Sequence, residues 1–198
     1  RVGELERHQI EVGELQAALR CFKTKIGMGP DHQNPRWWLQ LPQAGLEDLA
    51  GVLEEVEAMV AWPTPTQECL VQLLVKMQAA DRPISLTQAL YRVWGRLGRN
   101  QVAEWSAQRA PFWDKAIAGS SALRAAVLRQ AGMEIASALQ FSWAQIVYDI
   151  EKFYDHVTLA VVVETAMNVE YPLLALALAL QMHSAPRRVA TQVTVSGR

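Results

Sequence analysis

The residues best suited to chemistry lie in segment 148–157, which reads Tyr-Asp-Ile-Glu-Lys-Phe-Tyr-Asp-His-Val. The apolar residues just before it predict a strand over 145–150, with Asp149 near its C-terminal end. A carboxylate at the end of a strand is close to solvent, so its charge costs little desolvation, and its oxygens can bind a hard divalent cation. Taken alone, the same pattern also fits an Asp that caps a helix or a turn.

Positive charges form two further groups. Lys76 ends an apolar run, and Arg82 begins the sequence Arg-Pro-Ile-Ser-Leu. Arg92, Arg96 and Arg99 recur at helical spacing, which places them on one stripe of a predicted helix. A planar guanidinium group can donate hydrogen bonds to two phosphate oxygens at once, so the stripe can bind successive nucleic-acid phosphates. A solvated, solubilising helix face explains the same stripe equally well.

The rest of the sequence excludes several classes of enzyme and of nucleic-acid binder. It has no Gly-x-Ser-x-Gly or His-Glu-x-x-His motif, and its four histidines lack metal-ligand spacing. Cys21 and Cys69 lack zinc-type spacing, so we expect a reduced, intracellular protein. A net charge of −1 excludes nucleic-acid binding by bulk charge but is compatible with a local basic surface. No apolar stretch approaches the roughly 20 residues that cross a bilayer, so we expect no membrane partner.

Hydrophobic periodicity predicts the elements that position these residues. Apolar steps of three and four residues predict helices at 1–21, 46–60, 85–97, 121–139, 157–169 and 172–183. Short or alternating apolar runs predict strands at 69–76, 145–150 and 188–195. Gly and Pro in segment 24–43 predict a loop or linker, while segment 100–119 fits neither pattern. The expected fold class is α+β, helix-rich in the first two-thirds of the chain.

Two of these segments resemble reverse transcriptases (RNA-directed DNA polymerases) of the non-LTR retrotransposon type. Segment 148–157 resembles the first conserved palm motif, in which an Asp follows a hydrophobic strand and precedes an aromatic residue. Segment 75–86 resembles the fingers motif, in which a strand-end Lys precedes the Arg of an Arg-Pro-Ile-Ser-Leu run. The motifs stand in the expected order, and Trp62-Pro63 fits the entry to the fingers. The resemblance covers about residues 44–198.

The resemblance implies an architecture. It does not cover residues 1–43, for which the residue pattern predicts an N-terminal helix followed by a Pro/Gly-rich linker. Residues 44–140 would be a helix-rich, fingers-like region. Residues 141–198 would be part of a right-hand polymerase palm with an incomplete antiparallel sheet.

The resemblance also implies roles for individual residues. Asp149 matches the first metal-binding carboxylate, and the backbone carbonyl of Ile150 would be a further metal ligand. Lys76 and Arg82 match the cations that grip the triphosphate. Tyr154 matches the aromatic residue that selects deoxynucleotides by clashing with a 2′-hydroxyl group. Two Mg²⁺ ions would support phosphoryl transfer, and the partners would be an RNA template, a DNA primer and deoxynucleoside triphosphates.

The printed residues hold no adjacent Asp-Asp pair and no Gln-Gly helix motif, both of which the family places later in its palm. We therefore expect a fragment that depends on the remainder of a parent polypeptide and is inactive in isolation. The alternative is a non-catalytic retroelement remnant or a helical interaction module. The acidic helix face at 47–57 and the near-neutral charge favour that alternative.

Overall fold

The computed structural model describes residues 9–76, 79–111, 119–146, 148 and 156–190. The chain forms two compact units. Unit 1 consists of Arg1–Arg99 and Glu170–Arg198, and unit 2 consists of Asn100–Val169. The predicted α+β class is confirmed, since helices predominate and a small sheet accompanies them. The predicted segments 1–43, 44–140 and 141–198 stay a prediction.

Unit 1 contains a three-stranded sheet made of β1 (Cys69–Lys76), β2 (Ala79–Thr87) and β3 (Arg187–Ala190) in the order β2-β1-β3. Strands β1 and β2 pair antiparallel, from Cys69 opposite Thr87 to Lys76 opposite Ala79. Strand β3 pairs parallel with β1. The described sheet is therefore mixed, and the prediction of an antiparallel sheet was wrong for it. The reason is that β3 reaches the sheet through a helical crossover, and parallel neighbours require such long connections.

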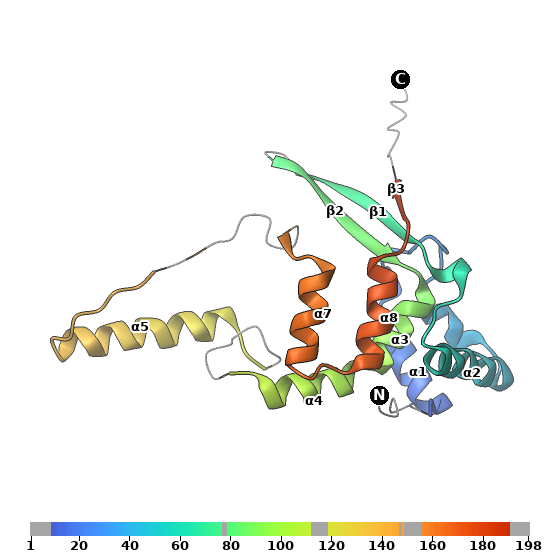
Figure 1. The fold of residues 1–198 in the computed structure, drawn as a ribbon, viewed down its shortest axis with the longest axis horizontal. Helices are drawn as coiled ribbons and strands as arrows, with labels where there is room; N and C mark the ends of the chain where they lie inside the picture. Colours follow the sequence, from blue (N-terminus) through green and yellow to red (C-terminus); the bar gives the residue numbers. More distant parts are fainter. Residues whose placement is uncertain (1–8, 77–78, 112–118, 147, 149–155, 191–198) are drawn as a thin grey trace, which may run out of the picture. The chain divides into compact units, whose positions relative to one another are not determined.

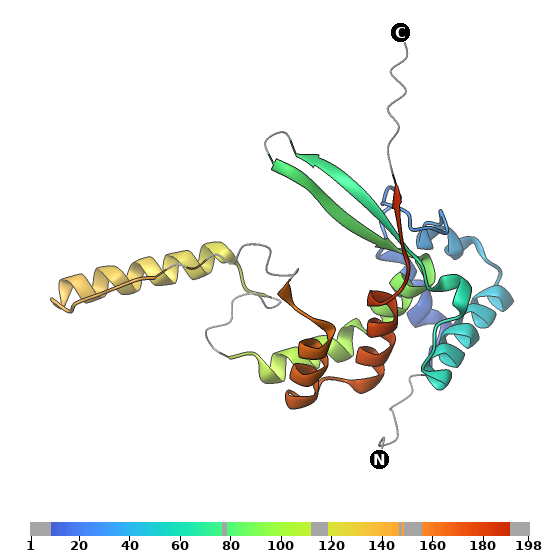
Figure 2. The same ribbon diagram turned by 45° about the horizontal axis from the view of Figure 1, so that its top comes forward.

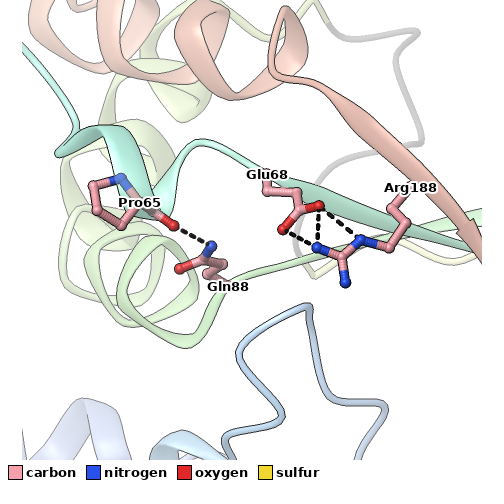
Figure 3. A network of polar contacts seen from close by, with 4 residues as sticks. All are labelled: Pro65, Glu68, Gln88 and Arg188. Atoms are coloured by element: carbon pink, nitrogen blue, oxygen red, sulfur yellow. Dashed lines mark hydrogen bonds and ion pairs between the residues drawn. The ribbon is translucent and has the colours of Figure 1, made fainter.

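Polar contacts fix the start of the sheet (Figure 3). Arg188 on β3 forms an ion pair with Glu68, with 2.7 Å between guanidinium nitrogen and carboxylate oxygen. The Gln88 side chain, just after β2, donates to the carbonyl of Pro65 at 2.7 Å. The Cys69 amide donates to the Pro186 carbonyl at 3.0 Å. These bonds hold the ends of all three strands together.

Four helices of unit 1 surround one apolar core. They are α1 (Val12–Arg20), α2 (Gln43–Met59), α3 (Ala89–Leu97) and α8 (Leu173–His183). Figures 1 and 2 show β1 and β2 running side by side as a hairpin whose turn end lies away from these helices. Each helix contributes fully buried side chains, listed here: Leu15, Leu19, Leu46, Leu53, Val93 and Leu178. The helices thus anchor the base of the hairpin.

Trp62 joins distant parts of this core. Its indole nitrogen donates to the Leu178 carbonyl at 2.9 Å, and its ring packs edge-on against Tyr91 and Trp94. The Gln181 side chain accepts from the Trp62 amide and donates to the Val60 carbonyl. Helix α8 is therefore tied to the end of α2 by both apolar and polar contacts.

Several predicted boundaries need correction. The helix predicted from Ser85 begins at Ala89, because Ser85–Thr87 belong to β2 and pair with β1. In the described part of 1–21, the helix begins only at Val12. The predicted loop 24–43 contains a 3-10 helix, η1 (Pro35–Gln40), and α2 begins at its last residue. A second 3-10 turn, η2 (Thr64–Thr66), precedes β1. The other boundaries of α2, β1, α8 and the described part of β3 agree closely with prediction.

Unit 2 contains α4 (Arg99–Arg109, starting one residue before the unit), α5 (Ala122–Ala138) and α7 (Leu159–Asn168). Side-chain caps explain where α5 and α7 begin: Ser121 accepts from the Arg124 amide and Thr158 from the Val161 amide. No helix in the described ranges is both long enough and apolar enough to cross a membrane.

The strand predicted at 145–150 was wrong in its described part. Gln145, Ile146 and Tyr148 are not in a strand. Ile146 is 72% exposed and Tyr148 is 82% exposed, so no neighbouring strand covers them. Strand conformation depends on a pairing partner, which this segment lacks among the described residues.

Candidate nucleic-acid interface

The residues predicted to form the palm site lie outside the described residues. These are Asp149, Ile150 and Tyr154. Within the described part of the chain, no three His, Cys, Asp or Glu side chains come together as metal ligands. Of the predicted site residues, the structure therefore describes the backbone positions of Lys76 and Arg82, and Arg92, Arg96 and Arg99.

Lys76 and Arg82 lie on the two arms of the β1–β2 hairpin. Lys76 is the last residue of β1 and pairs with Ala79, while Arg82 on β2 pairs with Leu74. The register shifts between Leu74 and Lys76, which marks a bulge or irregularity next to both positions. The backbone thus brings the two predicted cations close to the turn end of one hairpin.

Arg92, Arg96 and Arg99 line one hollow of about 470 Å³ in unit 1. Segment 21–26 forms its other wall. The predicted single helical stripe needs correction, because α3 ends at Leu97 and Arg99 begins α4. The Gly98 amide closes α3 by donating to the Trp94 carbonyl. Despite this break, all three arginines face the same hollow.

Phe22 positions two of these arginines. Its ring is buried, and the guanidinium carbons of Arg92 and Arg96 lie 5.7 and 5.5 Å from the ring centroid. Arg92 also donates to the Gly27 carbonyl at 2.8 Å. Burial lowers the pKa of Arg92, and the Asp31 carboxylate opposes this shift. Arginine nevertheless stays charged in proteins. Two positive charges, those of Arg92 and Arg96, therefore lie close together at the Phe22 ring.

The wall formed by the N-terminal segment is fixed by buried polar contacts. Asn34 is 2% exposed, donates to the carbonyls of Lys23 and Thr24, and accepts from the Arg36 amide. The Arg36 guanidinium donates to the Phe22 carbonyl at 2.9 Å. Segment 22–36 is thus a structured part of unit 1 rather than a free linker.

Two further contacts join this wall to the start of α3 and to the end of β2. The Asp31 carboxylate accepts from the Ala89 amide at 2.6 Å, so it caps the first turn of α3 from a distant segment. A Cβ atom on Gly29 would lie 2.2 Å from the Thr87 carbonyl oxygen, which leaves room only for glycine. The hollow therefore has a rigid rim on both sides.

Sequence reasoning missed two residues of this hollow. Lys23 adds a fourth cation, and Phe22 positions the arginines. The Arg36-Trp37-Trp38 cluster is the one available signal, because large aromatic side chains beside an Arg indicate that a loop docks on a neighbouring element. The Arg36 contacts agree with that interpretation, and Trp38 donates from its indole to Gln33 at 2.7 Å.

The sequence matches no protein-family model, and it is not significantly similar to any curated protein.

Proposed function

We propose that this chain forms the fingers and part of the palm of a reverse transcriptase, which extends a DNA primer on an RNA template. The observation that carries the proposal is the β1–β2 hairpin. In it Lys76 ends one strand and Arg82 lies on the next, and the resemblance implies a strand-end Lys shortly before this Arg. Both cations would then meet the triphosphate of an incoming deoxynucleotide.

The chemistry of this proposal is phosphoryl transfer, which depends mainly on positioning and charge neutralisation. Asp149 would ligate Mg²⁺ through its carboxylate, and Ile150 through its backbone carbonyl. Magnesium would lower the barrier by neutralising charge that builds up on the phosphate oxygens. Tyr154 would exclude ribonucleotides by steric conflict with their 2′-hydroxyl group. A second carboxylate motif would come from the remainder of the parent polypeptide.

Primer extension by the complete polypeptide that contains this chain tests the proposal. With an RNA template, Mg²⁺ and deoxynucleotides, Asp149→Asn should reduce synthesis to background, since the metal loses its ligand. Arg82→Ala should mainly raise the KM for the nucleotide, because it removes a triphosphate contact. Tyr154→Ala should raise incorporation of ribonucleotides relative to deoxynucleotides.

Asp155→Asn is the matched control for Asp149→Asn, because it removes the same charge a few residues away. It should leave synthesis close to wild type. Equal loss in both variants, or full synthesis by Asp149→Asn, contradicts the polymerase proposal.

A non-catalytic interaction module is the second candidate, and one observation favours it. Helix α5 exposes large apolar side chains, including Leu123 at 74% and Ile135 at 60%. Apolar faces of this kind mark contact surfaces. Under this hypothesis the Asp149 and Tyr154 variants have no effect on nucleotide chemistry, so the same assay separates the two functions.

A further inference from the structure

The hollow of unit 1 that Arg92, Arg96 and Arg99 line, here called the basic hollow, has only positive charges in its described lining. Lys23, Arg92, Arg96 and Arg99 line it, and its described lining contains no carboxylate. Among the described residues, Lys23, Arg96 and Arg99 form no ion pair. The nearby Asp31 carboxylate already accepts from the amides of Ala89 and Gln33. Four cations therefore share one concave surface whose described lining carries no carboxylate, and the nearby Asp31 acts on Arg92.

The packing holds these cations together against their repulsion. Arg92 and Arg96 both lie over the buried Phe22 ring, and Arg92 is also fixed by the Gly27 carbonyl. Asn34 and Gly29 keep the opposite wall in place. Because the positions are set by the fold, an anion that enters finds its ligands already arranged, so binding requires little reordering.

The shape selects among anionic partners. A hollow of about 470 Å³ is large enough for a nucleotide-sized ligand. A hollow of this size spans only a few nucleotides, and a flexible single strand can place successive phosphates in such a basic groove. Partly exposed Ile26 adds apolar surface beside the charges, where a base or sugar can pack.

We propose that the hollow between segment 21–26 and α3 binds the phosphate backbone of a single-stranded nucleic acid. The phosphates are contacted by Lys23, Arg96 and Arg99. Arg92, which is partly buried and bonded to the Gly27 carbonyl, adds positive charge, and Phe22 is a positioning residue. This site needs neither Mg²⁺ nor Asp149. The inference rests on the proposed function in that an RNA template is the expected partner, but its test requires no polymerase activity.

Binding of a fluorescent single-stranded RNA of about 20 nucleotides tests the proposal, measured by fluorescence anisotropy with the 198-residue chain in EDTA. The double variant Lys23→Ala/Arg99→Ala changes two exposed side chains, so it should fold normally. It should weaken binding about tenfold. Each lost phosphate contact should also lower the slope of log affinity against log salt by about 0.7.

Arg124→Ala/Arg129→Ala is the matched control, because it removes two exposed arginines from α5 in unit 2. It should retain the affinity and salt slope of the wild type. An equal loss in this control would show binding by general charge and would overturn the proposal. Tighter binding of a duplex with the same sequence would overturn it as well.

Cys21 provides an independent readout inside the hollow. It is exposed and lines the hollow, whereas Cys69 is buried. Single-stranded RNA should slow maleimide modification of Cys21 in the wild type, and this protection should fall in Lys23→Ala/Arg99→Ala. Unchanged modification of Cys21 at saturating RNA would overturn the proposal.

Asp149→Asn separates this site from the polymerase proposal. It should leave RNA binding in EDTA unchanged while primer extension by the complete polypeptide is lost. If the hollow is not the site, Lys23→Ala/Arg99→Ala binds RNA like the wild type, whatever the Asp149 variant does to synthesis.

Discussion

The helices of units 1 and 2 differ in how far they bury their apolar side chains. In unit 1, α1, α2, α3 and α8 bury large side chains completely, Leu53 and Val93 among them. In unit 2, α5 is just as long as α2, yet the only residue that it buries is Ala136. Helix α2 is therefore stabilised by tertiary packing, whereas α5 depends mainly on its own propensity and its cap. Matched variants in the two units test this difference.

The largest effect should come from the core of unit 1. Leu53→Ala leaves a cavity at a fully buried position and should lower the free energy of unfolding by about 3 kcal/mol. Leu128→Ala on α5 makes the same chemical change at 56% exposure and should cost less than about 1 kcal/mol. Urea denaturation followed by circular dichroism measures both. Similar losses in the two variants would mean that α5 packs as tightly as α2.

A smaller effect should come from Asn34 in the wall of the hollow. Asn34→Ala leaves the carbonyls of Lys23 and Thr24 without their donor and should cost about 2 kcal/mol. Ser121→Ala removes the cap of α5 and should cost about 1 kcal/mol, confined to that helix. Hydrogen exchange distinguishes the two variants. Asn34→Ala should speed amide exchange across unit 1, whereas Ser121→Ala should speed it only in α5.

The sequence predicted those parts of the fold that depend on local pattern. The apolar steps of α2 and α8 and the short apolar run of β1 are all visible within one element. Strand β2 (Ala79–Thr87) was not predicted, and its last residues were assigned to a helix, because its conformation depends on pairing with β1, which no local period encodes. Ile146 and Tyr148 show the converse, since β-forming residues without a partner do not form a strand.

The candidate site was predictable only in part, for the same reason. The helical spacing of Arg92 and Arg96 brought two arginines to one face. Their contact with Phe22 joins positions about 70 residues apart in sequence, which no spacing rule connects. The Gly and Pro content of segment 24–43 suggested a linker, although Gly29 and Asn34 anchor it. Asp149 lies outside the described residues, so its role stays a prediction.

The smallest effect, a pH dependence, should also distinguish the units. Burial raises the pKa of Tyr91 in unit 1 above its ordinary value of 10.0 and that of Cys69 above 9.0. Above these ordinary values the unfolded chain releases protons that the folded chain retains, so rising pH favours unfolding. Stability should be complete below about pH 9 and then fall as the pH rises further.

Tyr91→Phe should remove the tyrosine share of this alkaline loss, measured as the midpoint of urea unfolding between pH 8 and pH 11. Tyr148→Phe is the matched control in unit 2, because Tyr148 is 82% exposed. It should leave the pH profile unchanged. An identical profile for wild type and Tyr91→Phe would mean that the Tyr91 hydroxyl does not couple to folding.

The return of the chain through α8 and β3 has a consequence for biosynthesis. Trp62 finds its carbonyl acceptor at Leu178, and the Cys69 amide finds its acceptor at Pro186. While a ribosome is still adding residues 100–169, unit 1 lacks both partners, and one edge of β1 is open. The part of unit 1 that precedes residue 100 therefore stays incompletely closed until α8 and β3 have been translated.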